Sequence, residues 1–205
     1  MIRHLLVGLC VFALTASLAS AQSTRVLLRP GEVLSGRFTQ QLQRAGFTNA
    51  LDSEGSFVLS LDKGIVWRIE KPVSATIAIT PGAFVQWVNG KEVQHLAAAK
   101  APMLGDIYRL LAASLSGDRT ALANEFTLSE QDDGPAWRLL LQPRATNDIM
   151  ASQLQSVTVS GDRFIQAVVI QRPNGDTQTT RFVDLSLSTG ALPPEDQALL
   201  AAASQ

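Results

Sequence analysis

The sequence predicts a mainly β protein, a curved and incompletely closed antiparallel β-barrel with inserted helices that form a lid. Apolar and polar residues alternate with a period of two in two runs of short segments, and turn signals separate the segments. Between the two runs the apolar period changes to that of a helix. About ten strands in one antiparallel sheet are expected to curl, and a helix can then lie against the concave face.

The N-terminal segment has the pattern of a secretory signal. Arg3 precedes an apolar stretch from Leu5 to about Leu14, and Ala19-Ser20-Ala21 is a small-residue cleavage site. The apolar stretch is too short for a comfortable transmembrane helix. We therefore expect residues 1–21 to be a signal peptide and residues 22–205 to form a single domain, exported to the periplasm with Gln22 as its first residue.

The chain has a single cysteine, Cys10, which lies inside the predicted signal. It stands in the middle of the apolar stretch instead of after small residues at its end, so it does not resemble a lipid-attachment cysteine. The predicted mature domain then has no disulfide and no thiolate ligand. Export without disulfides suits a bacterial periplasm better than an extracellular scaffold, which would normally be smaller and disulfide-dense.

The first run of strands extends from about Val33 to the hairpin turn Asn89-Gly90. It begins with VLSGRFTQQLQ. Three strands follow within residues 55–80, separated by turns at residues 62–64 and 70–72, and AFVQWV is a fifth strand after the turn at residues 80–82. The period-two pattern places the apolar residues of each strand on one face of the sheet.

The middle of the chain predicts a helix, because Leu104, Ile107 and Leu111 repeat at helical spacing and Gly117 is a natural stop. A short second helix is expected over residues 119–124. Five further strands follow, with the sequences EFTLSEQ, AWRLLLQP, LQSVTVSG, RFIQAVVIQR and TQTTRFVDLSL. A capped C-terminal helix is expected to start near Pro194.

The sequence is poor in groups that catalyse reactions. Once the signal is removed, His95 is the only histidine, and it follows NGKEVQ in what is expected to be an exposed polar loop. No serine lies in a Gly-x-Ser-x-Gly elbow, no glycine-rich phosphate loop precedes a helix, and one histidine without cysteine is too few ligands for zinc. Asp132-Asp133-Gly134 is typical of a solvated turn. We expect no catalytic residue, metal or cofactor.

The charge balance also excludes one class of partner. The chain has 17 basic and 18 acidic residues, and Arg3 is lost with the predicted signal, so the domain has a net charge of −2. This balance predicts no electrostatic attraction to nucleic acid. The apolar face is then the main feature that needs an explanation. By pattern alone it is either a packed core or the wall of a cavity that holds a ligand.

Several short segments resemble the LolA family of periplasmic carriers of outer-membrane lipoproteins. GRFTQQL at residues 36–42 resembles the first strand of that family. GSFVLSLDKGIVWRIEKP matches its glycine, tryptophan and proline spacing at Gly55, Trp67 and Pro72. PMLGDIYRLLA resembles the helix that follows the first run of strands in that family. LLLQPRAT at residues 139–146 resembles the family's Leu-x-Pro-Lys/Arg segment. In order and spacing, these matches cover nearly the whole mature length.

The resemblance implies a half-closed barrel whose apolar hollow, under a helical lid, shelters the acyl chains of a lipoprotein. It also implies two partners, an inner-membrane ABC transporter that loads the carrier and an outer-membrane acceptor that unloads it; we expect the carrier itself to be a monomer. Ile65 and Trp67 match family positions that point into the hollow. With their neighbours by alternation and the lid helix, the expected ligand-binding residues are Phe57, Leu59, Ile65, Trp67, Ile69, Ile77, Val85, Trp87, Leu104, Ile107 and Leu111.

The chain departs from the family pattern at three places. Leu61 stands where the family usually has an arginine, the N-terminal segment is short and broken by Pro30-Gly31, and the C-terminus ends in a helix instead of an extra strand. Alternative functions are a carrier for a non-lipoprotein amphiphile, such as a glycolipid or a lipid-linked pigment precursor, an envelope sensor module of the same fold, and an enzyme, which the missing motifs disfavour.

Overall fold

A computed structural model describes residues 25–97, 100, 113, 119–133, 135–144 and 148–204. The predicted signal segment, residues 1–21, lies outside the described residues. So do Leu104, Ile107 and Leu111, and the expected helical lid with them. None of the described helices is long and apolar enough to cross a membrane.

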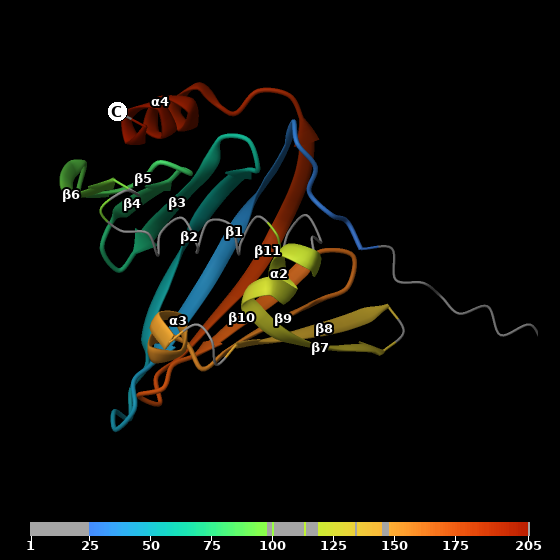
Figure 1. The fold of residues 1–205 in the computed structure, drawn as a ribbon. Helices are drawn as coiled ribbons and strands as arrows, with labels where there is room; N and C mark the ends of the chain where they lie inside the picture. Colours follow the sequence, from blue (N-terminus) through green and yellow to red (C-terminus); the bar gives the residue numbers. More distant parts are fainter. Residues whose placement is uncertain are drawn as a thin grey trace, which may run out of the picture.

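The described chain forms eleven strands and three helices (Figure 1). The first six strands are β1 (Glu32–Gln43), β2 (Leu51–Ser60), β3 (Gly64–Lys71), β4 (Ala75–Ile79), β5 (Ala83–Val88) and β6 (Lys91–Ala97). The remaining elements are α2 (Arg119–Glu125), β7 (Phe126–Asp133), β8 (Ala136–Pro143), α3 (Asp148–Gln153), β9 (Ser156–Gly161), β10 (Ile165–Gln171), β11 (Thr177–Thr189) and α4 (Pro194–Ala203). The mainly β class predicted from the sequence is confirmed.

All eleven strands belong to one antiparallel sheet with the order β6-β5-β4-β3-β2-β1-β11-β10-β9-β8-β7. The sheet is not closed into a barrel in the described part of the chain. The two runs of strands form two arms, and they join where the first strand pairs with the last. Glu32 lies opposite Thr189 and Gln43 lies opposite Thr177, so β1 and β11 pair along their whole length.

The sheet bends at this central pair. An extra residue in β11 shifts the register between Arg37 and Ser35, and Asp184 in that β-bulge has a φ of 54°. Gly36 lies opposite the bulge. A Cβ there would approach Leu185 Cδ2 to 2.7 Å and Phe57 Cε1 to 3.1 Å, so a residue without a side chain lets the two arms fold toward each other.

One strand differs from the sequence prediction. His95 lies on β6, the edge strand that pairs with β5, and is opposite Val85. The polar loop expected around His95 is therefore wrong. The segment is strongly polar because it is exposed on an edge, where apolar alternation is not required. The helices expected at residues 119–124 and from Pro194 agree with α2 and α4.

The described chain has three apolar clusters, two on the inner side of the sheet and one on its outer side. One covers the inner (concave) side of the β1–β5 arm, a second covers the inner side of the β7–β10 arm together with α2, and a third lies on the outer side of β3–β5 under α4. Figure 1 shows α4 outside the sheet and α2 between the two arms. The inner side is therefore where the two arms face each other.

Candidate functional site

The inner face of the β1–β5 arm is formed by residues that cross-strand pairing places side by side. Leu59 lies opposite Ile65, and Ile65 lies opposite Ile79. Phe57 lies opposite Trp67. Because directly opposite residues of antiparallel strands point to the same side, these apolar side chains form one continuous surface.

Four aromatic rings form the centre of this surface. The rings of Phe38 and Trp67 are stacked with centroids 3.9 Å apart, and Phe57 lies 5.7 Å from Trp67. Phe182 of β11 contacts Phe57 edge-on at 5.4 Å. Phe57 and Trp67 were expected on this face from the sequence. Phe38 and Phe182 were not. Phe38 lies opposite Gly55 in the pairing of β1 with β2, whereas only the long-range pairing of β1 with β11 brings Phe182 there.

Most of the described candidate ligand-binding residues lie on one face of the sheet, as the period-two pattern predicted. Phe57, Leu59 and Ile65 are buried in the inner cluster, and Trp67 and Ile69 pack against it. Ile77 lies opposite Trp67 and so shares the inner face, where it is half-buried. Whether any of these residues contacts a ligand stays a prediction.

The expected placement of Val85 and Trp87 on the same face is wrong. Both lie on the outer face, where Val85 is opposite Ala78 and belongs to the cluster under α4. The cause is the two-residue turn Pro81-Gly82. It places Ile79 opposite Phe84, so the alternation changes from odd to even residue numbers between β4 and β5. The length of this turn was the sequence signal that could have predicted the change of face.

A small apolar hollow lies between the two arms, with a volume of about 120 Å³. Its walls come from both inner clusters and from the segment that precedes β1. The described lining residues are Arg25, Val26, Leu27, Leu28, Leu34, Arg119, Leu122, Trp137, Leu139, Phe164, Ile165 and Leu187. The lining is apolar except for two arginines.

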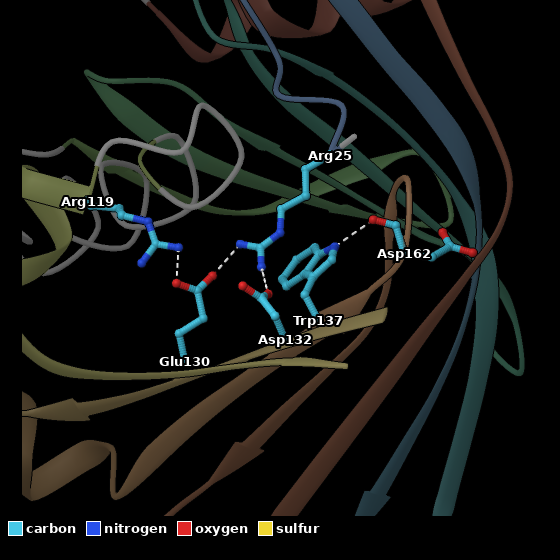
Figure 2. A network of polar contacts seen from close by, with 6 residues as sticks. All are labelled: Arg25, Arg119, Glu130, Asp132, Trp137 and Asp162. Atoms are coloured by element: carbon cyan, nitrogen blue, oxygen red, sulfur yellow. Dashed lines mark hydrogen bonds and ion pairs between the residues drawn. The ribbon is translucent and has the colours of Figure 1, made fainter. Parts of the chain in front are cut away.

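Both arginines are paired with carboxylates (Figure 2). Arg25 contacts Glu130 through one guanidinium nitrogen and Asp132 through the other. Arg119 of α2 contacts the second carboxylate oxygen of Glu130. Burial acts to raise the pKa of Glu130, but the hydrogen bonds from Arg119 and Arg25 outweigh it, so the pKa lies below its ordinary value.

Trp137 links these charges to the apolar wall. The Arg25 guanidinium carbon lies 4.5 Å from the centre of the Trp137 ring, within the range of a cation–π contact. The indole Nε1–H donates to the backbone carbonyl of Asp162 at 2.6 Å, which satisfies the one polar atom of this buried ring. Figure 2 shows the arginine lying over the ring.

A second depression, of about 410 Å³, lies at the other end of the sheet. It is lined mainly by polar side chains of β1, β2 and β11, and it includes Lys71 paired with Glu54 at 2.7 Å. Although it is larger, its polar walls would not shelter apolar chains. Within the described residues, no cluster of three or more histidine, cysteine or carboxylate side chains could hold a metal ion.

The open, curved sheet and its apolar inner face define a half-barrel protein. The chain belongs to the family described as outer membrane lipoprotein carrier protein LolA-like, whose model matches residues 14–200. That description names a carrier and no catalysed reaction. The comparison with curated proteins returned no match.

Three solved structures are similar to the chain at low sequence identity. A LolA superfamily protein from Nitrosomonas europaea is 8% identical, with 85% of this chain and 94% of that chain covered and a TM-score of 0.40. A DUF1329 family protein from Desulfovibrio piger is 10% identical, with 80% and 88% covered and a TM-score of 0.41. The Pseudomonas aeruginosa MucA/MucB complex is 19% identical, with 81% and 54% covered and a TM-score of 0.35.

Proposed function

We propose that this protein is a periplasmic carrier that shelters the acyl chains of lipoproteins against the inner face of its half-barrel. The observation that carries the proposal is the continuous apolar surface on the concave side of an open sheet. It extends from Ile79 through the four aromatic rings to the hollow beside Trp137. Membership of the LolA-like family supports the same role.

The physical requirement for such a carrier is simple. Each buried methylene is worth about 0.8 kcal/mol, so a long acyl chain left in water costs on the order of 10 kcal/mol. A protein that crosses an aqueous compartment with this cargo must cover the chain with apolar side chains. It needs shape and apolar area, and it needs no group that attacks or titrates.

The aromatic rings suit this task for a further reason. Large flat rings such as Trp67 and Phe182, which are both partly exposed, offer wide apolar contact without branched shapes that fix one packing. Acyl chains of different length can therefore lie across them. The partners in this proposal are an acylated lipoprotein, an inner-membrane ABC transporter that loads it, and an outer-membrane acceptor that receives it.

The identity of the bound molecule tests the proposal directly. Protein purified from its own periplasm and measured by native mass spectrometry should carry an acylated species. A lipoprotein or its acylated N-terminal peptide supports the function as stated. A glycolipid or another free amphiphile would keep the carrier and replace its cargo.

Binding by the purified protein is the second test. An uncharged fluorescent acyl probe should bind with one site. The bound probe should raise the melting temperature, because at a free concentration c it stabilises the folded state by RT ln(1 + c/Kd). A protein that carries no amphiphile from the periplasm and binds no acyl probe would contradict the proposed function.

A further inference from the structure

The segment before β1 crosses the inner face instead of leading away from it. We call residues Arg25–Arg29 the strap. The amide of Val26 donates to the carbonyl of Arg163 at 2.8 Å, next to β10, while Leu28 is buried in the inner cluster of the β1–β5 arm with only 3% of its surface exposed. The strap therefore contacts both arms of the sheet. Figure 1 shows it passing from the start of β1 toward the β7–β8 side.

The strap occupies apolar surface that an acyl chain would need. Leu28 packs within the same cluster as Leu34, Leu59 and Phe57, and residues Arg25–Leu28 line the hollow between the arms. The hollow measures about 120 Å³. A cavity of roughly 150 Å³ holds one benzene molecule, and pockets for larger ligands measure about 300–1,000 Å³. A long acyl chain does not fit beside the strap.

Within the described residues, the strap is attached at a small number of points. The Val26 amide and the Leu28 side chain hold it, the Arg29 amide donates to the Glu32 carboxylate at 2.8 Å, and Arg25 lies over Trp137. It is also held by the anchor, which we define as Arg25 with its partners Glu130 and Asp132. Leu27 is 44% exposed. Of the two partners in the anchor, Glu130 has a side chain that is 23% exposed and Asp132 one that is 61% exposed, so water competes mainly with the pair that Asp132 makes.

The other end of the strap has the geometry of a pivot. Gly31 has a φ of 81°, and its amide donates to the Asp62 carboxylate at 2.6 Å. The amide of Glu32 closes a turn on the carbonyl of Arg29 at 3.0 Å. These bonds fix the point at which the strap leaves β1. The pairing of β1 with its neighbours begins only at Glu32 and Val33, so the strap precedes the paired part of the chain.

We propose that the strap is an internal occupant of the acyl-binding surface, held by the anchor, which cargo displaces when it binds. This inference rests on the proposed function. The same side chains of the inner face cannot contact Leu28 and an acyl chain at once. Weakening the anchor therefore favours cargo, and fixing the strap in place excludes it.

Loss of the anchor is the first test. In the mature protein, Arg25→Ala should bind the uncharged acyl probe at least fivefold more tightly than the wild type, because the competing segment is held less firmly. The matched control is Arg138→Ala. It removes the same charge from the neighbour of Trp137 on β8, but its side chain is exposed on the outer face, so probe binding should stay within twofold of the wild type. An Arg25→Ala variant that melts normally and binds no more tightly than the control overturns the proposal.

The second test is a reversible disulfide crosslink that holds the strap in place, and it does not depend on Arg25. The backbone hydrogen bond from the Val26 amide to the Arg163 carbonyl, at 2.8 Å, holds these two residues side by side, and neighbouring Cβ atoms are what a disulfide requires. The pair Val26→Cys/Arg163→Cys should therefore form one, and the natural chain has no cysteine other than Cys10 in the predicted signal. The oxidised protein should bind the probe at least tenfold more weakly than the same protein after reduction.

The pattern of results separates this inference from the function on which it rests. Equal binding by the oxidised and reduced forms, with the wild type also binding, overturns the strap's role and leaves the carrier intact. Failure of the wild type, Arg25→Ala and the reduced double variant to bind any acyl probe overturns the carrier function, and the displacement of the strap by cargo falls with it.

Discussion

The two faces of the β1–β5 arm are both apolar, yet they are covered in different ways. On the outer face Val66, Ala78 and Val85 are almost completely buried under α4, which contributes Leu200 and Ala203. On the inner face Leu28 of the strap packs in the cluster that holds the aromatic rings, and Leu28 and Leu34 of that cluster also line the hollow between the arms. A ten-residue helix covers one face, and a five-residue coil crosses the other.

The ion pairs that hold the two covers also differ in how deeply they are buried. Asp196 at the start of α4 is 1% exposed and pairs with Arg68 on β3, so the outer cover is fixed by a buried carboxylate. Neither partner of Arg25 is buried to that degree, since the side chain of Glu130 is 23% exposed and that of Asp132 is 61% exposed. The outer face thus has the properties of a permanent core, while the cover of the inner face has those of a removable one.

The largest expected effect tests the fixed cover of the outer face. Asp196→Ala leaves the Arg68 guanidinium without its buried partner and should lower the free energy of unfolding by about 3 kcal/mol. Glu195→Ala is the control, since Glu195 lies 3.6 Å from the same Arg68 nitrogen but is 77% exposed, and it should cost about 0.5 kcal/mol or less. Urea denaturation measures both. Equal losses would mean that α4 is not held by Asp196.

Two neighbouring residues of β3 test the faces against each other. Ile65 is on the inner face and Val66 on the outer, with exposures of 6% and 0%. Ile65→Ala and Val66→Ala should each lower the free energy of unfolding by about 2 kcal/mol. Only Ile65→Ala should also change the Kd for the acyl probe. Titration of both variants checks this, and an equal change in Kd would remove the distinction between the faces.

The bend between the arms should be sensitive to a single methyl group. Gly36→Ala brings a Cβ to 3.1 Å from the Val183 carbonyl oxygen as well as 2.7 Å from Leu185, and should cost about 1 kcal/mol. Gly82→Ala has space, with its nearest atom at 3.9 Å, and serves as the control for a glycine substitution in the same arm. Thermal melting compares them. If Gly36→Ala melts like the control, the centre of the inner face is less tightly packed than described.

The smallest expected effect is a pH dependence of the anchor. Glu130 faces Arg25 and Arg119, and Asp132 lies beside it on β7. The pKa of Glu130 is lowered in the folded protein from its ordinary value of about 4.5. The contribution of its ion pairs to the anchor is therefore complete above pH 4.5. That contribution is lost as the pH falls through the lowered pKa and Glu130 becomes protonated.

Binding of the uncharged acyl probe should consequently tighten, by less than tenfold, only as the pH is lowered below about 4.5. Glu130→Gln should bind more tightly already at pH 6 and show a flatter profile. Identical profiles for the two proteins would exclude Glu130 as the group responsible.

The sequence determined the local structure of this protein well. Alternation of apolar residues placed Phe57, Trp67 and Ile69 on one face, because the two-residue period of a strand is a local property. Turn residues and helix signals located ten of the eleven strands and both α2 and α4. The missing strand, β6, is an exposed edge that carries no alternation to detect.

Tertiary structure alone decided which surfaces meet. The pairing of β1 with β11 joins residues more than a hundred positions apart, and it brings Phe182 onto Phe57 and bends the sheet at Gly36. The reversal of β5, which puts Val85 and Trp87 on the outer side, differs from these cases because the length of the turn at Pro81-Gly82 is a local signal that the sequence contains.

The strap is the clearest case. Val26, Leu27 and Leu28 form an apolar run too short for a period to show, and nothing local indicates that Arg25 would find Glu130 and Asp132. The chain's own periodicity fixes which side of a strand is apolar. What covers that side depends on segments distant in sequence, whose contacts exist only once the two arms have folded toward each other.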